Sequence, residues 1–186
     1  MNIYIALLRG INVGGKNMIK MAELKRVLES IGLCEVKTYI QSGNVLFKSN
    51  ESEEDLRKKI EHAIETNFGF LVAIVIRTAD ELDEIIRNCP FSEEEISEAE
   101  SASETECLYV SLMTQVPVQD KMERLDVYKG ENEKYQIIGR EVYLLFRQSI
   151  RNSKIAINLH KLEVPATVRN WKTMNKIAAL AKAMEA

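Results

Sequence analysis

The chain has 186 residues, of which 46% are hydrophobic and 28% are charged. This composition predicts a globular protein with one sizeable domain or two small ones, and it excludes a disordered chain. The 25 lysines and arginines against 28 aspartates and glutamates give a net charge of −3. The chain therefore has no overall basic field to hold nucleic acid or an anionic membrane, and such a partner would need a local patch.

The cysteines and the apolar runs indicate the compartment. The three cysteines are far apart and form no Cys-x-x-Cys pair, which argues against a disulfide framework and a zinc ribbon. The segment MNIYIALLRG lacks a basic leader and a cleavage site, so we do not expect a signal peptide. The apolar run at residues 71–76 is far shorter than the roughly 20 residues of a membrane helix. We therefore expect a cytoplasmic protein without a membrane partner.

Negative charge is concentrated in the middle of the chain. Residues 50–106 contain 17 acidic and five basic side chains, whereas the segments on either side are net basic. Within this stretch, residues 92–106 hold seven acids and no base, a composition typical of a solvated connector. We therefore predict two subdomains, residues 1–90 and 107–186, joined by an acidic connector at residues 91–106. A docking segment for a basic partner is the alternative reading of the same residues.

The first 90 residues predict the element order β-α-β-β-α-β. Strands are expected at residues 3–8, 36–40, 45–47 and 70–76, and helices at residues 21–31 and 52–64. Asn17 is expected to cap the first helix and Gly32 to end it, while Ser52 and Asp55 form a capping box for the second. This order is that of the ferredoxin-like fold, in which an antiparallel sheet carries both helices on one face.

A related order recurs in the second half. A capping box of Thr78 and Glu81 opens a helix that bridges the two halves. Strands are then expected at residues 108–113, 134–138 and 142–146, and helices at residues 118–125, 155–162 and 171–180. The sequence thus predicts an α+β protein with a ferredoxin-like βαββαβ N-terminal half, a related βαββα half and a C-terminal helix, as in a diverged duplication.

Three segments resemble the family named domain of unknown function 1697. They are RGINVGGKN after the first strand, TYIQSGNVLF across the first hairpin and ATVRNWKT near the C-terminus. The resemblance spans nearly the whole chain and implies a compact bacterial-type α+β protein with ferredoxin-like substructure, but it implies no activity. The family commonly has Thr or a similar polar residue where this chain has Val168, a departure that leaves the Arg-Asn-Trp core of the motif intact.

The glycine-rich loop is the first candidate site. Its glycines allow backbone N–H groups to approach a ligand, and its cations favour an anion such as a phosphate. The spacing approaches that of a Walker A motif, but Asn17 replaces the hydroxyl that binds Mg²⁺, so we do not expect nucleotide hydrolysis. The alternative is that the glycines only serve left-handed turns. The candidate residues of this loop are Arg9, Gly10, Asn12, Gly14, Gly15 and Lys16.

Two further polar clusters are candidates for the same ligand. The hairpin turn carries more hydrogen-bonding side chains than a turn requires, although a structural role is the alternative. Its candidates are Tyr39, Gln41, Ser42 and Asn44. Near the C-terminus, Thr167 or Asn170 is expected to cap the last helix, which places Arg169 in or near its first turn as an anion clamp. The candidates there are Arg169, Asn170 and Trp171, with core packing as the alternative for the tryptophan.

Constellations typical of catalysis are missing from the sequence. His62 and His160 fall in expected helices without metal-ligand spacing, and no nucleophile elbow surrounds Ser42. We therefore expect no metal site; no catalytic residue or cofactor is identified, and whether the protein is an enzyme stays open. The preferred hypothesis is a protein that binds a small anionic ligand, phosphorylated or carboxylated. The alternatives are a nucleic-acid-binding protein, disfavoured by few exposed aromatics, and an interaction module that uses the acidic segment.

Overall fold

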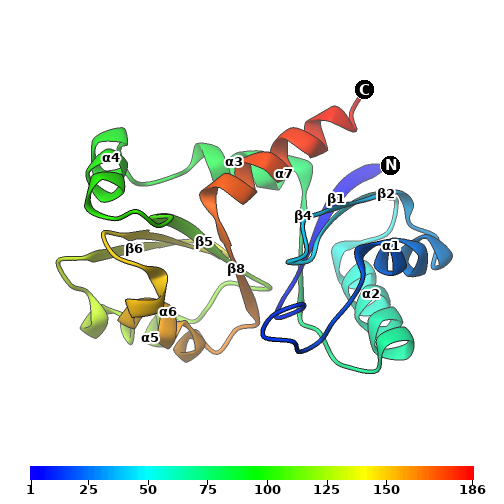
Figure 1. The fold of residues 1–186 in the computed structure, drawn as a ribbon, viewed down its shortest axis with the longest axis horizontal. Helices are drawn as coiled ribbons and strands as arrows, with labels where there is room; N and C mark the ends of the chain where they lie inside the picture. The colour runs from blue at the N-terminus through cyan, green and yellow to red at the C-terminus, as the bar shows by residue number, and fades with distance from the viewer. The chain divides into compact units, whose positions relative to one another are not determined.

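The computed structural model describes residues 1–186 and divides into two compact units (Figure 1). The first unit comprises Met1–Glu84 with Asn175–Ala186, and the second comprises Ile85–Met174. Each unit contains one four-stranded antiparallel sheet with helices, which makes the protein an α+β protein. Because the division falls at residues 84–85 and 174–175, the acidic segment lies inside the second unit and does not separate the two.

The first unit has the predicted βαββαβ order. Its elements are β1 (Asn2–Leu8), α1 (Met21–Ser30), β2 (Cys34–Tyr39), β3 (Asn44–Ser49), α2 (Glu53–Phe68) and β4 (Ile74–Thr78). The strand order is β2-β3-β1-β4 and every neighbouring pair is antiparallel. This is the ferredoxin-like topology that the sequence predicts.

The core of the first unit explains why these residues form these elements. On β1, the alternate residues Tyr4, Ala6 and Leu8 belong to one buried cluster, as the two-residue period of a strand requires. The same cluster contains Leu24 of α1 and Leu56 of α2, so both amphipathic helices bury their apolar stripes against one face of the sheet. Figure 1 shows α1 and α2 together on one side of this sheet.

Two of the predicted helix starts are confirmed and one is wrong. The Ser52 hydroxyl accepts a hydrogen bond from the Asp55 backbone N–H at 3.2 Å. Thr78 and Glu81 cap each other's backbone N–H groups at 2.8 and 3.2 Å. Asn17 does not cap α1, because the N-cap position is Lys20, whose side chain makes no capping bond. Asn17 lies three positions before Lys20, in the preceding loop, where its φ of 50° forms part of a turn.

The second unit repeats the topology of the first. Its elements are α3 (Ala79–Arg87, which begins in the first unit), α4 (Glu93–Ala102), β5 (Leu108–Met113), α5 (Gln119–Glu123), η1 (Asp126–Tyr128), β6 (Glu133–Ile138), β7 (Glu141–Phe146), η2 (Ile150–Asn152), α6 (Lys154–Asn158), η3 (Leu159–Leu162), β8 (Ala166–Asn170) and α7 (Trp171–Ala183, which ends in the first unit). The strand order β6-β7-β5-β8 matches that of the first sheet position by position. The expected duplication is therefore a complete βαββαβ unit.

Strand β8 is the element that the sequence analysis missed. It pairs antiparallel with β5, with Val110 opposite Arg169 and Leu112 opposite Thr167. Thr167 and Arg169 are buried although both are polar, so the strand lacks the alternation of apolar and polar residues that marks a half-buried strand. The sequence therefore did not predict a strand here, and Thr167 and Asn170 were considered only as caps of the following helix.

The acidic segment forms a helix where we expected a solvated connector. Helix α4 begins at a capping box in which Ser92 and Glu95 bond each other's backbone N–H groups, at 2.8 and 3.1 Å. Acidic residues in a first turn are favoured by the helix dipole. Ile96 and Ala99 pack against the sheet of the second unit next to Leu145, so one narrow apolar stripe anchors the helix.

Candidate functional site

The glycine-rich loop joins β1 to α1 and folds back on itself. Val13 and Lys16 form an antiparallel bridge, and the Lys16 N–H donates to the Val13 carbonyl at 3.0 Å. Gly14 and Gly15 lie between them with φ values of 58° and 73°, as the tightest two-residue turns require. Both glycines are exposed, and neither backbone N–H donates a hydrogen bond within the protein. The glycines thus serve left-handed turns, which was the alternative reading of the loop, and this conformation leaves the N–H groups of Gly14 and Gly15 open to solvent.

The side chain of Asn12 connects this loop to its surroundings. Its Nδ2 donates to the Ile19 carbonyl at 3.0 Å and to the Gln41 carbonyl at 2.8 Å, while its Oδ1 accepts from the Ile19 N–H at 2.8 Å. Its φ of 54° is in the left-handed region, which Asn tolerates better than most residues. Because these bonds use both ends of the amide, Asn12 positions the loop.

The turn between β2 and β3 packs against the start of the glycine-rich loop. The Leu8 N–H donates to the Gly43 carbonyl at 2.9 Å. Gly43 has a φ of 85°, and a Cβ there would lie 2.7 Å from Leu8 Cβ and 2.9 Å from Ile11 Cδ1. Two of the three polar clusters found in the sequence therefore lie together in the first unit, and this contact requires a glycine.

The polar side chains of the hairpin differ in how they are used. Asn44 is fully buried, and its Nδ2 donates to the Tyr39 carbonyl at 3.0 Å and to the Ser42 hydroxyl at 2.9 Å. These bonds hold the turn and assign Asn44 a structural role. The Gln41 side chain is exposed, and those of Tyr39 and Ser42 are half-buried.

Basic side chains of the loop lack acidic partners. Arg9, Lys16 and Lys20 are exposed, and none of them forms an ion pair. The Asn17 side chain donates to the Gly10 carbonyl at 3.3 Å. Arg9 precedes Gly10 and Lys16 precedes Asn17, so each of the two cationic residues is next to one partner of this hydrogen bond. Lys20 was not among the candidates from the sequence, although no acidic residue occurs between residues 9 and 22.

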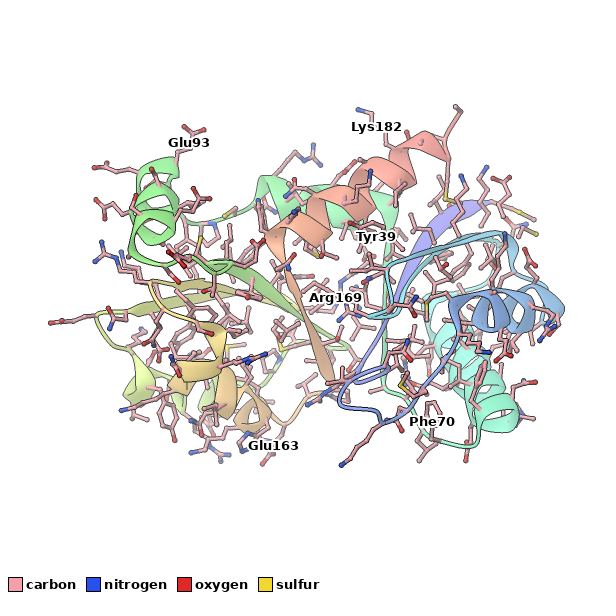
Figure 2. All side chains as sticks on the ribbon, viewed as in Figure 1. Tyr39, Phe70, Glu93, Glu163, Arg169 and Lys182 are labelled. Carbon is pink, nitrogen blue, oxygen red and sulfur yellow. The ribbon has the colours of Figure 1, made fainter.

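The third polar cluster belongs to the second unit. Arg169 lies on β8 (Figure 2), two residues before α7, and is only 8% exposed. It donates to the Thr167 hydroxyl at 2.7 Å and to the Val168 carbonyl at 3.0 Å. Burial lowers the pKa of its guanidinium to about 10. These contacts give Arg169 a structural role in addition to any role toward a ligand.

The neighbours of Arg169 also have structural roles. The Asn170 side chain accepts from the Thr173 N–H at 2.8 Å, which confirms Asn170 as a cap of α7. Trp171 is partly buried against the cluster that contains Ala99 and Leu145. Trp171 therefore takes part in core packing, which was the alternative reading of this residue from the sequence.

A hollow of about 340 Å³ in the second unit is lined by none of the residues that the sequence analysis singled out. Its lining residues are Pro90, Phe91, Glu95, Lys129, Gly130, Glu133, Lys134, Tyr135 and Gln136. The charges around it are mostly paired, Lys134 with Glu95 at 3.0 Å and Lys129 with Asp126 at 2.9 Å. No cluster of His, Cys, Asp and Glu in the protein has the arrangement of a metal site, and no helix has the length and hydrophobicity to cross a bilayer.

Comparisons with known proteins give a family and a structural relative. The conserved bacterial protein SP0830 from Streptococcus pneumoniae has a similar structure, with a TM-score of 0.73 and 26% sequence identity over 97% of this chain and 98% of that protein. A search of curated proteins found no match. The model of the family described as protein of unknown function (DUF1697) matches residues 1–143. The chain therefore belongs to the DUF1697 family.

Proposed function

We propose that this protein binds a small anionic ligand, phosphorylated or carboxylated, at the glycine-rich loop. The observation that carries the proposal is the set of exposed cations without acidic partners: Arg9, Lys16 and Lys20. Two of the three other exposed lysines of the first half are paired, Lys25 with Glu29 at 3.9 Å and Lys58 with Glu54 at 2.7 Å. A bound anion would supply the negative charge that these unpaired cations lack.

The backbone of the loop supports the same ligand class. The N–H groups of Gly14 and Gly15 are open to solvent at the tip of the turn, and such groups bind phosphate and carboxylate oxygens. Arg9 offers a planar fork that grips two oxygens at once, and Lys16 offers a compact point charge. We assign ligand contact to these four residues and to Lys20.

The remaining candidates have a different part in the proposal. Asn12 and Asn44 hold the loop and the hairpin turn in place. Gln41 and Ser42, with Tyr39, could add hydrogen bonds to the ligand from the turn. Arg169 stays a prediction from its residue type, and the proposal does not depend on it. No catalytic step is included, because the loop contains no nucleophile or general base.

The experiment is a calorimetric titration of the protein with inorganic phosphate, pyrophosphate and acetate at low salt, supported by thermal unfolding. A ligand that binds only the native state at about a hundredfold excess over its Kd stabilises the protein by about 2.7 kcal/mol. We expect Lys16→Gln to weaken phosphate binding about tenfold, the loss of one charge-assisted hydrogen bond. Lys182→Gln is the matched control, since Lys182 is exposed on α7 and unpaired (Figure 2). Equal affinities of both variants would refute the proposed site.

A further inference from the structure

Three apolar side chains stand exposed around the glycine-rich loop. Val13 is 65% exposed, Met18 63% and Ile40 49%. From these residues we infer that the ligand carries an apolar group next to its anionic group. This inference rests on the proposed function and names the class of ligand more closely, as an organic phosphate or carboxylate with an aliphatic substituent.

The hydrogen bonds of Asn12 bring the three side chains to one region of the surface. Val13 follows Asn12 in the chain. Met18 precedes Ile19, and Ile40 precedes Gln41, and both of these neighbours bond directly to the Asn12 side chain. Val13 is thus next to Asn12 in the chain, and Met18 and Ile40 are each next to a residue that the Asn12 side chain bonds. Val13 and Met18 also belong to the same loop as Lys16, with Val13 three positions before it and Met18 two positions after it.

The backbone of Ile40 is strained in a way that burial does not offset. Its φ is 51°, in the left-handed region that β-branched residues avoid. Glycine or asparagine at this position of the turn would remove the strain. Because half of the side chain is exposed, packing within the protein does not account for an isoleucine here. Contact between the side chain and a ligand does account for it.

The charges around the apolar residues select the kind of molecule. Arg9, Lys16 and Lys20 lack acidic partners, so an uncharged apolar molecule would leave them unsatisfied, and inorganic phosphate would leave the apolar side chains in water. An anionic bilayer shares this mixed chemistry. However, the three residues lie on a loop and a tight turn, not along the apolar face of an amphipathic helix, the usual device for a bilayer surface. We therefore assign a soluble ligand.

The test compares inorganic phosphate, monobutyl phosphate and monohexyl phosphate by calorimetry. If about half of each added methylene is buried, affinity should rise about fourfold for every two methylenes. Ile40→Gly should not lower the melting temperature, because it relieves the strain, but it should bring the Kd of monohexyl phosphate close to that of inorganic phosphate. Met18→Ser should also bring the Kd of monohexyl phosphate closer to that of inorganic phosphate. Val127→Ser is the matched control, because Val127 is 78% exposed in the second unit, and it should change neither value.

The outcomes separate this inference from the proposed function. If inorganic phosphate binds and chain length has no effect, or if Ile40→Gly leaves the preference unchanged, the apolar contact is refuted while anion binding stands. If neither the three phosphates nor acetate binds, both are refuted. Vesicles that contain phosphatidylglycerol form a further arm: cosedimentation that depends on Ile40, without binding of monohexyl phosphate, would overturn the assignment of a soluble ligand.

Discussion

The side-chain amide of Asn12 donates to the backbone carbonyl of Gln41 across 2.8 Å, and in this way it joins the glycine-rich loop to the β2–β3 turn. The two residues are 29 positions apart, and the contact makes two separate polar segments into one surface. Because the same amide also bonds both backbone groups of Ile19, the loop is held at three points. The backbone of a loop fixed in this way has little conformational entropy left to lose when a ligand binds.

Replacing Asn12 tests this role. Asn12→Ala removes three hydrogen bonds and places a Cβ residue without local compensation at a φ of 54°. We expect the free energy of unfolding in urea to fall by about 2–4 kcal/mol. Asn12→Gly keeps the backbone conformation and should lose less than Asn12→Ala. An alanine variant as stable as the wild type would show that the three bonds do not hold the loop.

Two glycines of the site should respond very differently to alanine. At Gly43 the added Cβ would lie 2.7 Å from Leu8 Cβ, whereas at Gly14 it would meet nothing within 4 Å. Both have positive φ, so Gly14→Ala reports the backbone strain alone, about 1 kcal/mol. We expect Gly43→Ala to cost at least about 2 kcal/mol more in the same denaturation experiment. Similar losses at both positions would contradict the close packing of the turn on Leu8.

Burial makes Arg169 a stability determinant. Arg169→Ala leaves the Thr167 hydroxyl and the Val168 carbonyl without their guanidinium donor inside the protein. The expected loss in the free energy of unfolding is about 2–4 kcal/mol. Substitution of a solvent-exposed arginine would cost almost no stability, so the size of the loss reports the burial of Arg169. Chemical denaturation followed by circular dichroism measures the loss; a change below about 0.5 kcal/mol would contradict the buried role.

Helix α4 should make stability depend on pH through Glu95. The Ser92 backbone N–H and, next, Lys134 lower the pKa of the Glu95 carboxyl below its usual 4.5. The folded state therefore favours the carboxylate, so its contribution is complete above the usual pKa and is lost as pH falls through the lowered value. We expect the melting temperature of Glu95→Gln to fall less than that of the wild type between about pH 7 and pH 3. Glu93→Gln is the matched control, and parallel profiles for Glu95→Gln and wild type would refute the coupling.

Elements with a clear period could be predicted from the sequence. In the first unit, β1, β3 and β4 are short, nearly continuous buried runs, the helices show helical spacing, and turn residues mark the ends. The strand β8 could not be predicted in this way, because the inward positions Thr167 and Arg169 are polar and their burial depends on tertiary contacts. Helix α4 was missed for the opposite reason: its composition is that of a solvated segment, and Ile96 and Ala99 alone anchor it.

The candidate site was predictable by residue type but not by role. The glycines and cations of the loop stood out in the sequence, whereas the bonding of Asn12 and Asn44 inside the protein is a matter of three-dimensional distance. Ile40 was expected to end the strand at residues 36–40, but β2 ends at Tyr39 and Ile40 lies in the turn with a positive φ, which cannot be read from a sequence. The exposure of Val13 is likewise a property of the fold.

The most direct test of the central claim is an NMR titration of ¹⁵N-labelled protein with inorganic phosphate at low salt. The account predicts that the largest amide shifts occur at Gly14 and Gly15, that smaller shifts extend over residues 9–20, and that Lys16→Gln reduces them. Shifts that spare this loop, or no shifts at millimolar phosphate, would contradict anion binding at the glycine-rich loop.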